Sequence, residues 1–426
     1  MSDVKSLRAP GSSLLWRAVM LFTNFMCVIL AYYQVKVASR SLLLEHGGAE
    51  AFPYVWIGSA LVLLGFIGIY TRLIANHSRL RVIIASLLLF AVLLVAFHWR
   101  LRGAGIATVV AFYIFVDLFS VVLVEQFWSL ANSVTQPGEG QKSYWFIATG
   151  GLVGGVAGGA TASALIEFTP MQTVDLLLSC AALLMLTAAV NLFMERQAMF
   201  REVVPEQAIK LQGEGLRAVL ANRYLLLIAA IACFSQLVEP LVEYQFLSAI
   251  AERFSDTEAR SRFIGSFFSV MGGVAIAINV LVTPVLHRYL GTLAGLAAQP
   301  LNVVLATCGF VAQPGIMSAS VMKIADRGLS YSINRASRET LYINVDPLLT
   351  YQAKAWIDMF GYRTFKVFGS GLILTILAFS PAARVGYDLA WLTLLICAFW
   401  IAAVVVLGRE QQRLLLRNPR PANAVP

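Results

Sequence analysis

Long apolar runs are the feature that most constrains the fold of this chain. Runs long enough to cross a bilayer lie near 16–38, 51–75, 80–99, 104–130, 143–166, 172–194, 223–251, 263–286, 291–313, 314–341, 350–380 and 386–408. Only 13% of the 426 residues are charged, whereas a soluble protein would have about a quarter. The sequence therefore predicts an all-α membrane protein with twelve transmembrane helices.

The longest polar stretch inside the chain divides these runs into six and six. It contains Pro205, Gly213 and Gly215 among charges of both signs. We expect an N-terminal six-helix half at 1–194, a cytoplasmic connector at 195–222, and a C-terminal six-helix half with a short tail at 223–426. Two six-helix halves are typical of the major facilitator fold.

The basic residues predict the topology, because Lys and Arg resist translocation. With both termini in the cytoplasm, the inside segments carry 18 Lys and Arg and the outside segments carry 7. We therefore expect a multi-pass protein of a bacterial inner membrane, surrounded by lipid. The net charge of +9 then reflects the loops and not a nucleic-acid partner. The scattered Cys and His residues indicate neither disulfides nor a metal, and we expect a monomer without a cofactor.

Charges inside the spans point to a polar pathway, because each costs about 2.5–3.5 kcal/mol to insert. They concentrate in the first, fourth, seventh and tenth spans, the four that line the central cavity of a facilitator. The residues that we expect to contact substrate are Lys36, Asp117, Glu125, Glu239, Glu243, Lys323, Arg327, Asn334, Arg338 and Glu339. Toward the cytoplasmic end, Asp358, Arg363 and Lys366 suggest a gate or a structural network. For each charge, ion pairing remains an alternative to substrate contact.

Spacing refines two of these expectations. Lys323, Arg327 and Arg338 fall on one predicted helical stripe, and we expect the phosphate of an anionic ligand to supply the missing negative charge. Glu239 and Glu243 are four residues apart. We expect one of them to pair with Lys36 or a base of 314–341, and the other to exchange a coupling proton near neutral pH.

Small residues indicate where helices approach closely. The run 143–166 carries six glycines between Gly150 and Gly159, and the run 263–286 carries Gly265, Gly272 and Gly273. Such patterns allow backbones to touch in lipid. We expect these two spans, together with the Gly-bearing runs 51–75 and 350–380, to form the contacts between the halves.

Three blocks of the sequence form a recognisable pattern. They are the stretch from Tyr331 through Arg338-Glu339 to Lys354-Ala-Trp-Ile-Asp358, Arg363 and Lys366; the segment from Gln126 to Asn132; and Gly48-Ala49-Glu50 before Pro53. Together they resemble the nucleotide (ATP/ADP) translocases of plastids and intracellular bacteria. The resemblance implies a twelve-helix facilitator that exchanges phosphorylated, usually nucleotide, substrates. It also implies that Arg338-Glu339 stand at the family's Lys-Glu pair. By the same resemblance, Asp117 lies near its acidic position in the fourth helix and Lys36 in the region of its first-helix basic cluster.

The chain departs from that family at several positions. Arg335 and Ala336 stand where the translocases have Asp-Pro, and Arg40 falls within an altered first-helix signature. We therefore interpret the protein as a secondary transporter of an organic anion, a nucleotide or another phosphorylated metabolite, by exchange or ion coupling. Two alternatives are a flippase or exporter of an amphipathic lipid or cell-wall precursor, and a membrane enzyme or sensor. We expect no enzymatic activity, because no catalytic signature is present.

Overall fold

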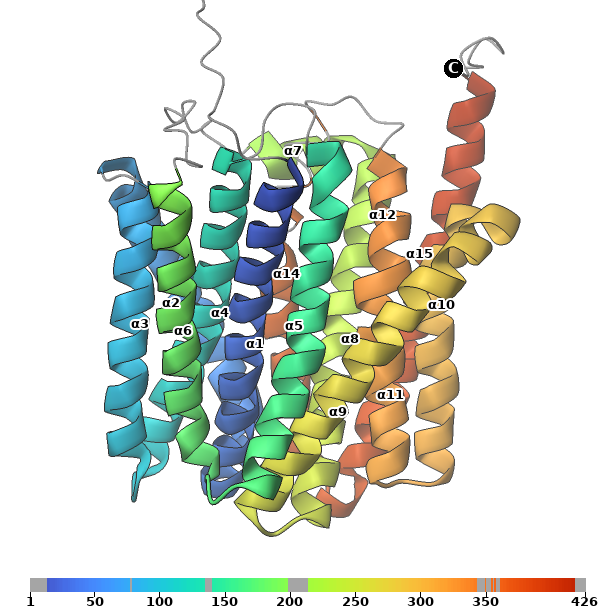
Figure 1. Ribbon diagram of the computed structural model, residues 1–426. Helices are drawn as coiled ribbons and strands as arrows, with labels where there is room; N and C mark the ends of the chain where they lie inside the picture. The colour runs from blue at the N-terminus through green and yellow to red at the C-terminus, as the bar shows by residue number, and fades with distance from the viewer. Residues whose placement is uncertain are drawn as a thin grey trace, which may run out of the picture. The chain divides into compact units, whose positions relative to one another are not determined.

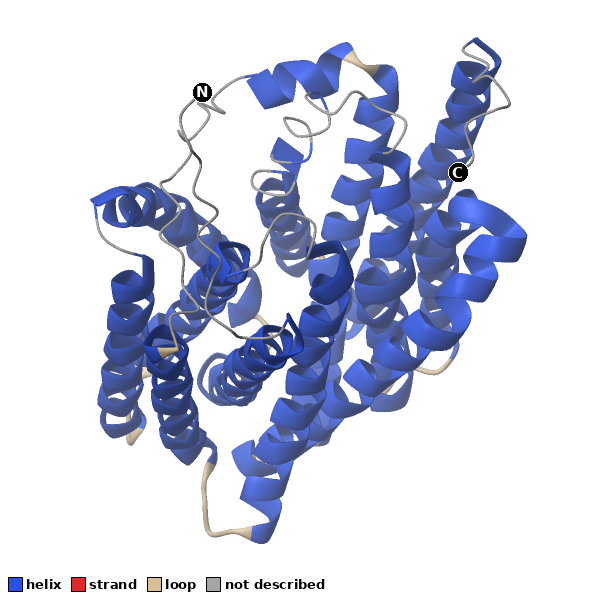
Figure 2. Ribbon diagram, turned by 45° about the horizontal axis from the view of Figure 1, so that its top comes forward, coloured by secondary structure: helices blue, strands red, loops and turns tan. Residues whose placement is uncertain are grey.

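The fold is all-helical, as predicted. The computed structural model describes residues 14–76, 79–134, 140–197, 214–342 and 361–417, together with 349, 354, 356 and 357. Within these residues every regular element is a helix and none is a strand (Figure 2). Helices suit an apolar environment because each satisfies its backbone N–H and C=O groups internally.

Contacts divide the chain into two compact units. The first comprises Met1–Gly48, Leu61–Ala208 and Phe254–Gly272, and the second comprises Ala49–Ala60, Ile209–Arg253 and Gly273–Pro426. Two helices, α2 and α9, contribute residues to both. The predicted division into halves at 195–222 stays a prediction.

The first unit contains most of the helices from α1 to α6. They are α1 (Leu14–Gly47), α2 (Ala51–Asn76), α3 (Arg79–Leu101), α4 (Ile106–Val134), α5 (Gly140–Phe168), the 3-10 turn η1 (Thr173–Asp175), α6 (Leu176–Arg196) and most of α9 (Thr257–Ala277). The helix α1 packs between α5 and α6 and also contacts α4 (Figure 1).

Glycines explain how closely α5 approaches its neighbours. A Cβ atom at Gly154 would lie 2.5 Å from the carbonyl oxygen of Met26 on α1. Farther along α5, a Cβ atom at Gly159 would lie 2.6 Å from the carbonyl oxygen of Gly265 on α9. The hydroxyls of Ser163 and Ser266 lie 2.8 Å apart beside this contact. The two glycine-bearing spans therefore meet, and their predicted part in contacts between the halves stays a prediction.

The second unit contains the helices that carry most of the predicted charges. They are α7 (Glu214–Ala221), α8 (Arg223–Arg253), the π-helical turn η2 (Ile278–Val282), α10 (Thr283–Ala312), α11 (Ile316–Leu329), the π-helical turn η3 (Ser330–Asn334), α12 (Arg335–Leu341), α14 (Tyr362–Phe379), the 3-10 turn η6 (Ala382–Arg384) and α15 (Val385–Arg417). Here α8 contacts α11, α14 and α15, and α10 contacts α11 and α15. At Gly291 the left-handed backbone, with φ of 77°, breaks α10 near the turn predicted before residue 291.

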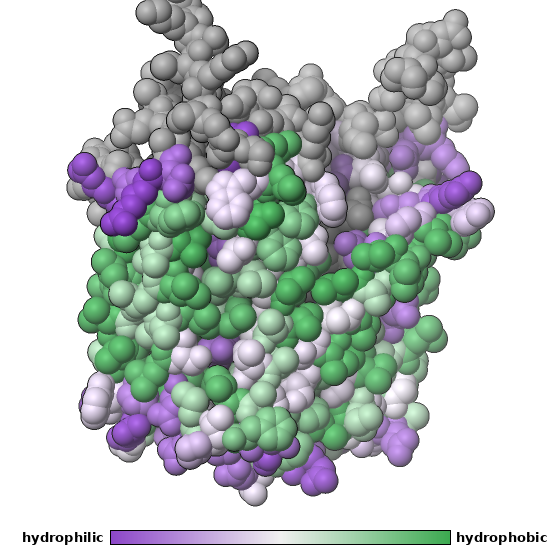
Figure 3. Space-filling model, in the orientation of Figure 1, coloured by the Kyte–Doolittle hydropathy of each residue, from purple (hydrophilic) through white to green (hydrophobic). Residues whose placement is uncertain are grey.

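The helices fit a membrane by length and composition. Among the described residues, nine helical stretches are long and apolar enough to cross a bilayer, one of which is the kinked stretch Thr257–Ala312. On the face drawn in Figure 3, green hydrophobic residues cover the middle of the left-hand helices α3 and α6, and purple hydrophilic residues gather at their ends. The chain is therefore a multi-pass membrane protein, and the number twelve stays a prediction.

Candidate functional site

Six charged side chains form a cluster inside the second unit, which we call the charge cluster. Its acids are Glu239 and Glu243 on α8 and Asp326 on α11; its bases are Lys323 and Arg327 on α11 and Lys366 on α14. All three acids and Lys323 are buried. Charges this far from water need partners, because an unpaired ion in a medium of low dielectric constant is very costly.

Two parallel ion pairs join α8 to α11. The Nζ atom of Lys323 lies 2.5 Å from Oε2 of Glu243. One turn away, Arg327 pairs with Glu239. Each helix carries its two charges four residues apart, so that both point from the same face. The acids of α8 therefore meet the bases of α11 in register.

A third base approaches from α14. The Nζ atom of Lys366 lies 3.3 Å from Oε1 of Glu239, and also 5.8 Å from the ring centre of Trp56 on α2. The side chain of Lys366 is 36% exposed, compared with 2% for Lys323. Arg363 precedes Lys366 by one turn on the same helix. Lys366, which the sequence assigned to a gate or structural network, thus belongs to the charge cluster.

Two amides extend the charge cluster toward α10. Gln299 donates hydrogen bonds from Nε2 to the carbonyl oxygen of Asp326, at 3.0 Å, and to Oδ1 of Asp326, at 3.1 Å. In turn, Oε1 of Gln299 accepts a hydrogen bond from Nδ2 of Asn334, at 2.5 Å. One buried glutamine therefore connects Asp326, which precedes the π-helical turn η3, to Asn334, the last residue of that turn.

The predicted single stripe over 314–341 was wrong beyond Arg327. In a continuous α-helix, Asn334 would lie on the face of Lys323 and Arg327, but here it shares Gln299 with Asp326. The cause is η3, whose wider turn shifts the register of the residues within it and after it. Arg338 follows η3 and donates a hydrogen bond to the hydroxyl of Tyr362 on α14.

Two expectations about charge balance were also wrong. Both Glu239 and Glu243 pair with bases of α11, so the expected pairing of one of them is confirmed, but neither is left as the predicted unpaired proton site. The bases Lys323 and Arg327 pair with these acids, so no ligand phosphate is needed to balance their charge. The sequence argument failed because it weighed the charges of one helix and could not know which face of α8 lies opposite.

Glu339, another predicted residue of this unit, lies outside the charge cluster. Glu339 is exposed, and its Oε2 lies 2.6 Å from Nζ of Lys354, in a pair whose side chains are 50% and 40% exposed. Asp358 lies outside the described residues. Near-surface pairs of this kind contribute little to stability.

In the first unit, aromatic rings surround two basic side chains. The Nζ atom of Lys36 on α1 lies 4.7 Å from the ring centre of Tyr33 and 4.6 Å from that of Phe268 on α9. Arg40, one turn farther on α1, lies 5.8 Å from the ring centre of Phe268 and 5.7 Å from that of Tyr113 on α4. These distances fit cation–π attraction, which stabilises a cation through the negative ring face. We call Tyr33, Tyr113 and Phe268 the ring group.

The acids predicted in the first unit lie on α4. Asp117 is half-buried and Glu125 is exposed. The neighbouring Gln126 instead points inward and donates a hydrogen bond to the hydroxyl of Ser86, at 2.8 Å.

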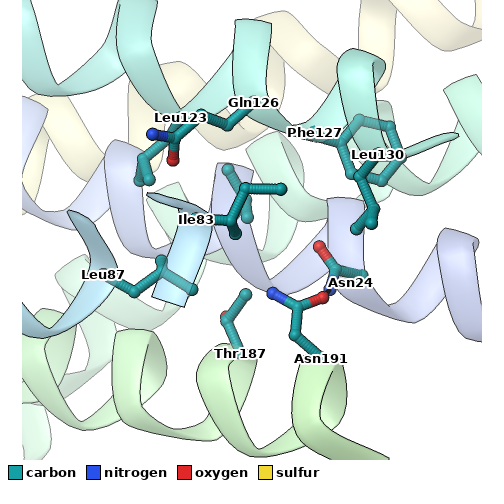
Figure 4. Close-up of a pocket in the computed structure, with 10 residues that line it drawn as sticks. Asn24, Ile83, Leu87, Leu123, Gln126, Phe127, Leu130, Thr187 and Asn191 are labelled. Atoms are coloured by element: carbon teal, nitrogen blue, oxygen red, sulfur yellow. Dashed lines mark hydrogen bonds between the residues drawn. The ribbon is translucent and has the colours of Figure 1, made fainter. Parts of the chain in front are cut away.

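Gln126 lines a small cavity between α1, α3, α4 and α6. Asn24 and Asn191 point toward each other across it and share a hydrogen bond of 2.6 Å (Figure 4). Its volume of about 10 Å³ suits about one water molecule and is far too small for a nucleotide. Oε1 of Gln126 is buried without a hydrogen bond from the described residues, which such a water would supply.

Sequence reasoning missed Gln299 and Trp56 and left Asp326 out of the site. A signal for Gln299 was available, since it is an amide beside Pro300 in a largely apolar run. Trp56 gave no signal, because tryptophan is ordinary in a membrane span.

No group of three or more His, Cys, Asp or Glu within the described part of the chain is arranged to hold a metal ion.

Comparison with known proteins places the chain among transporters. "ADP,ATP carrier protein 1" of Chlamydia muridarum is 22% identical over 88% of this chain and 86% of its own length. The protein of the same name from Rickettsia bellii is 22% identical over 75% of this chain and 72% of its own length.

Solved structures share the fold. A bacterial homologue of the iron transporter ferroportin, in an inward-facing state, has a TM-score of 0.66 at 14% identity and covers 93% of this chain and 99% of its own. A mutant of the nucleoside transporter NupG has a TM-score of 0.63 at 14% identity, with the same coverage. Residues 92–314, just over half of the chain, match the family described as TLC ATP/ADP transporter. This chain belongs to the TLC ATP/ADP transporter family, as its sequence blocks predicted, and is a transporter and not an enzyme.

Proposed function

We propose that this protein is a secondary transporter that carries a nucleotide or another phosphorylated metabolite by alternating access, through exchange or ion coupling. Membership of the TLC family supports transport, and relatives named ADP,ATP carrier support a nucleotide. Twelve spans in two halves, with both termini in the cytoplasm of a bacterium and the protein in the inner membrane, complete the proposal.

The observation that carries the substrate class is the pair of cations over the ring group. Lys36 and Arg40 are half-buried and lie against aromatic rings. A cation positioned in this way can bind phosphate, while the rings offer flat faces to a nucleobase. We propose that Lys36 and Arg40 contact the anion.

The charge cluster has a different proposed role. Its three acids balance its three bases, so it has no excess of positive charge with which to attract phosphate. Alternating access requires polar contacts that can break and re-form, and buried ion pairs of this kind hold one arrangement until ligand binding favours another. We propose Lys323, Arg327, Glu239, Glu243 and Lys366 as this switching network.

Counterflow in liposomes tests the proposal. Purified protein is reconstituted with unlabelled ATP inside, and entry of labelled ATP, ADP, other nucleotides and sugar phosphates is measured. We expect labelled nucleotide to accumulate transiently, and Lys36→Met to raise the KM more than it lowers the maximal rate. The matched control is Lys354→Met, which removes an exposed base.

A flippase would give the opposite pattern. Translocation of a fluorescent phospholipid, with no counterflow and no thermal stabilisation by any nucleotide or sugar phosphate, would replace this proposal with the lipid alternative.

A further inference from the structure

We infer that Asp326 is the proton-binding site of this transporter, and that its protonation gives the charge cluster the positive charge that draws in the anionic substrate. The inference rests on the proposed function and adds the coupling ion to it. Asp326 lies on α11, outside the set of residues proposed above to contact substrate or to switch.

Asp326 is the acid with the weakest ionic partner in the charge cluster. It is 1% exposed. Its Oδ1 accepts one hydrogen bond from the neutral amide of Gln299, and its Oδ2 lies 3.9 Å from Nε of Arg327 without a hydrogen bond from the described residues. By contrast, Glu243 lies 2.5 Å from Lys323. A proton would therefore bind Asp326 before either glutamate.

The protonation state of Asp326 sets the net charge of the charge cluster. The groups that act on Asp326 are Lys323 and Arg327 of α11, Glu243 of α8, Gln299 of α10 and the thiol of Cys397 of α15. Asn334 of η3 is joined to it through Gln299, and Glu239 of α8 and Lys366 of α14 belong to the same charge cluster. With every acid and base ionised, the charge cluster is neutral. Protonation of Asp326 leaves one positive charge in excess.

That excess charge links the proton to the anion. A net charge in a site of low dielectric constant is costly, and an anionic ligand nearby offsets the cost. The proton comes from water on one side, binds an oxygen of the Asp326 carboxylate, and returns to water on the other side after the anion has left. No bond of the substrate changes and no electron is transferred.

The test compares net uptake with exchange in proteoliposomes. Labelled ATP uptake into empty vesicles is measured with and without an acidic exterior, and counterflow is measured in ATP-loaded vesicles at equal pH. We expect the acidic exterior to speed wild-type net uptake several-fold. Asp326→Asn should lose this stimulation and retain counterflow, while the control Glu167→Gln, which neutralises an exposed acid on α5, should keep it.

Two results overturn the inference while leaving the proposed function standing. One is wild-type net uptake that ignores the pH difference while counterflow proceeds, and the other is Asp326→Asn that responds to the pH difference as the wild type does. Absence of both net uptake and counterflow with every phosphorylated substrate would instead overturn the proposed function.

Infrared spectroscopy tests the proton directly, without substrate. In difference spectra of purified protein between acidic and basic pH, we expect a carbonyl band of a protonated carboxyl that Asp326→Asn lacks and Glu167→Gln retains. If Asp326→Asn does not fold, isotopic labelling of the aspartate carboxyls in wild-type protein should shift this band. A spectrum without the band, or a band that neither change affects, contradicts the inference.

Discussion

The two units hold their membrane-embedded cations in different ways. In the first unit, Lys36 and Arg40 lie against the rings of Phe268 and its neighbours, whereas in the second unit Lys323 and Arg327 lie against carboxylates. A ring attracts a cation without cancelling its charge, and a carboxylate cancels it. We propose that the cations of the first unit serve the anionic substrate, whereas those of the second unit hold a network of opposite charges together.

The largest effect should follow from breaking the most buried pair. Lys323→Met leaves Glu243 charged and without its close partner, and we expect it to lower the free energy of unfolding by about 3–5 kcal/mol. The measurement is denaturation of the purified protein in detergent. The double variant Lys323→Met/Glu243→Gln should recover most of this loss, because no charge is then left uncompensated. A double variant as unstable as the single one would contradict the pairing.

A smaller loss in the free energy of unfolding should follow from crowding the contact between α5 and α9. At this contact the first unit depends on close backbone packing and not on charge. Gly159→Ala places a Cβ atom against the backbone of Gly265, so the helices must separate. We expect a loss of about 1–3 kcal/mol in the same assay. Gly273→Ala is the control, since its Cβ atom would meet no atom within 4 Å. Equal losses in the two variants would count against tight contact at Gly159.

The ring group should contribute less than the ion pairs. A double-mutant cycle of Lys36→Met and Phe268→Leu measures the coupling between cation and ring, for which we expect about 0.5–2 kcal/mol. The corresponding cycle for Lys323 and Glu243 should give a larger coupling. A Lys36–Phe268 coupling as large as that of the buried pair would remove the distinction drawn between the two units.

The smallest effect should come from the exposed pair. Lys354→Met breaks its contact with Glu339, but both side chains are largely in solvent. We expect a change in the free energy of unfolding of about 0.2–1 kcal/mol. A loss near that of Lys323→Met would show that exposure does not set the strength of these pairs.

Much of this fold could be predicted from the sequence, because an apolar run long enough to cross a bilayer can be recognised without knowing its neighbours. The acids of α8 and the bases of α11 could also be identified, since each pair is four residues apart. Their pairing could not, because it depends on which faces two helices present to each other. The same holds for the rings beside Lys36. Tyr33 is three residues away on the same helix, but Phe268 is far away in the sequence, so its contact with Lys36 could not be predicted.

The π-helical turn η3 has a consequence for how this gene can vary in length. Such a turn holds one residue more than the α-helix around it, as a past insertion would leave it. Because the turn takes up this extra residue, deleting one residue within 330–333 should leave α12, with Arg338 beside Tyr362, close to its present orientation. In the continuous α-helices on either side, the same deletion would turn every following residue by about 100°. A one-residue deletion should therefore be tolerated better in this segment than in the helices around it.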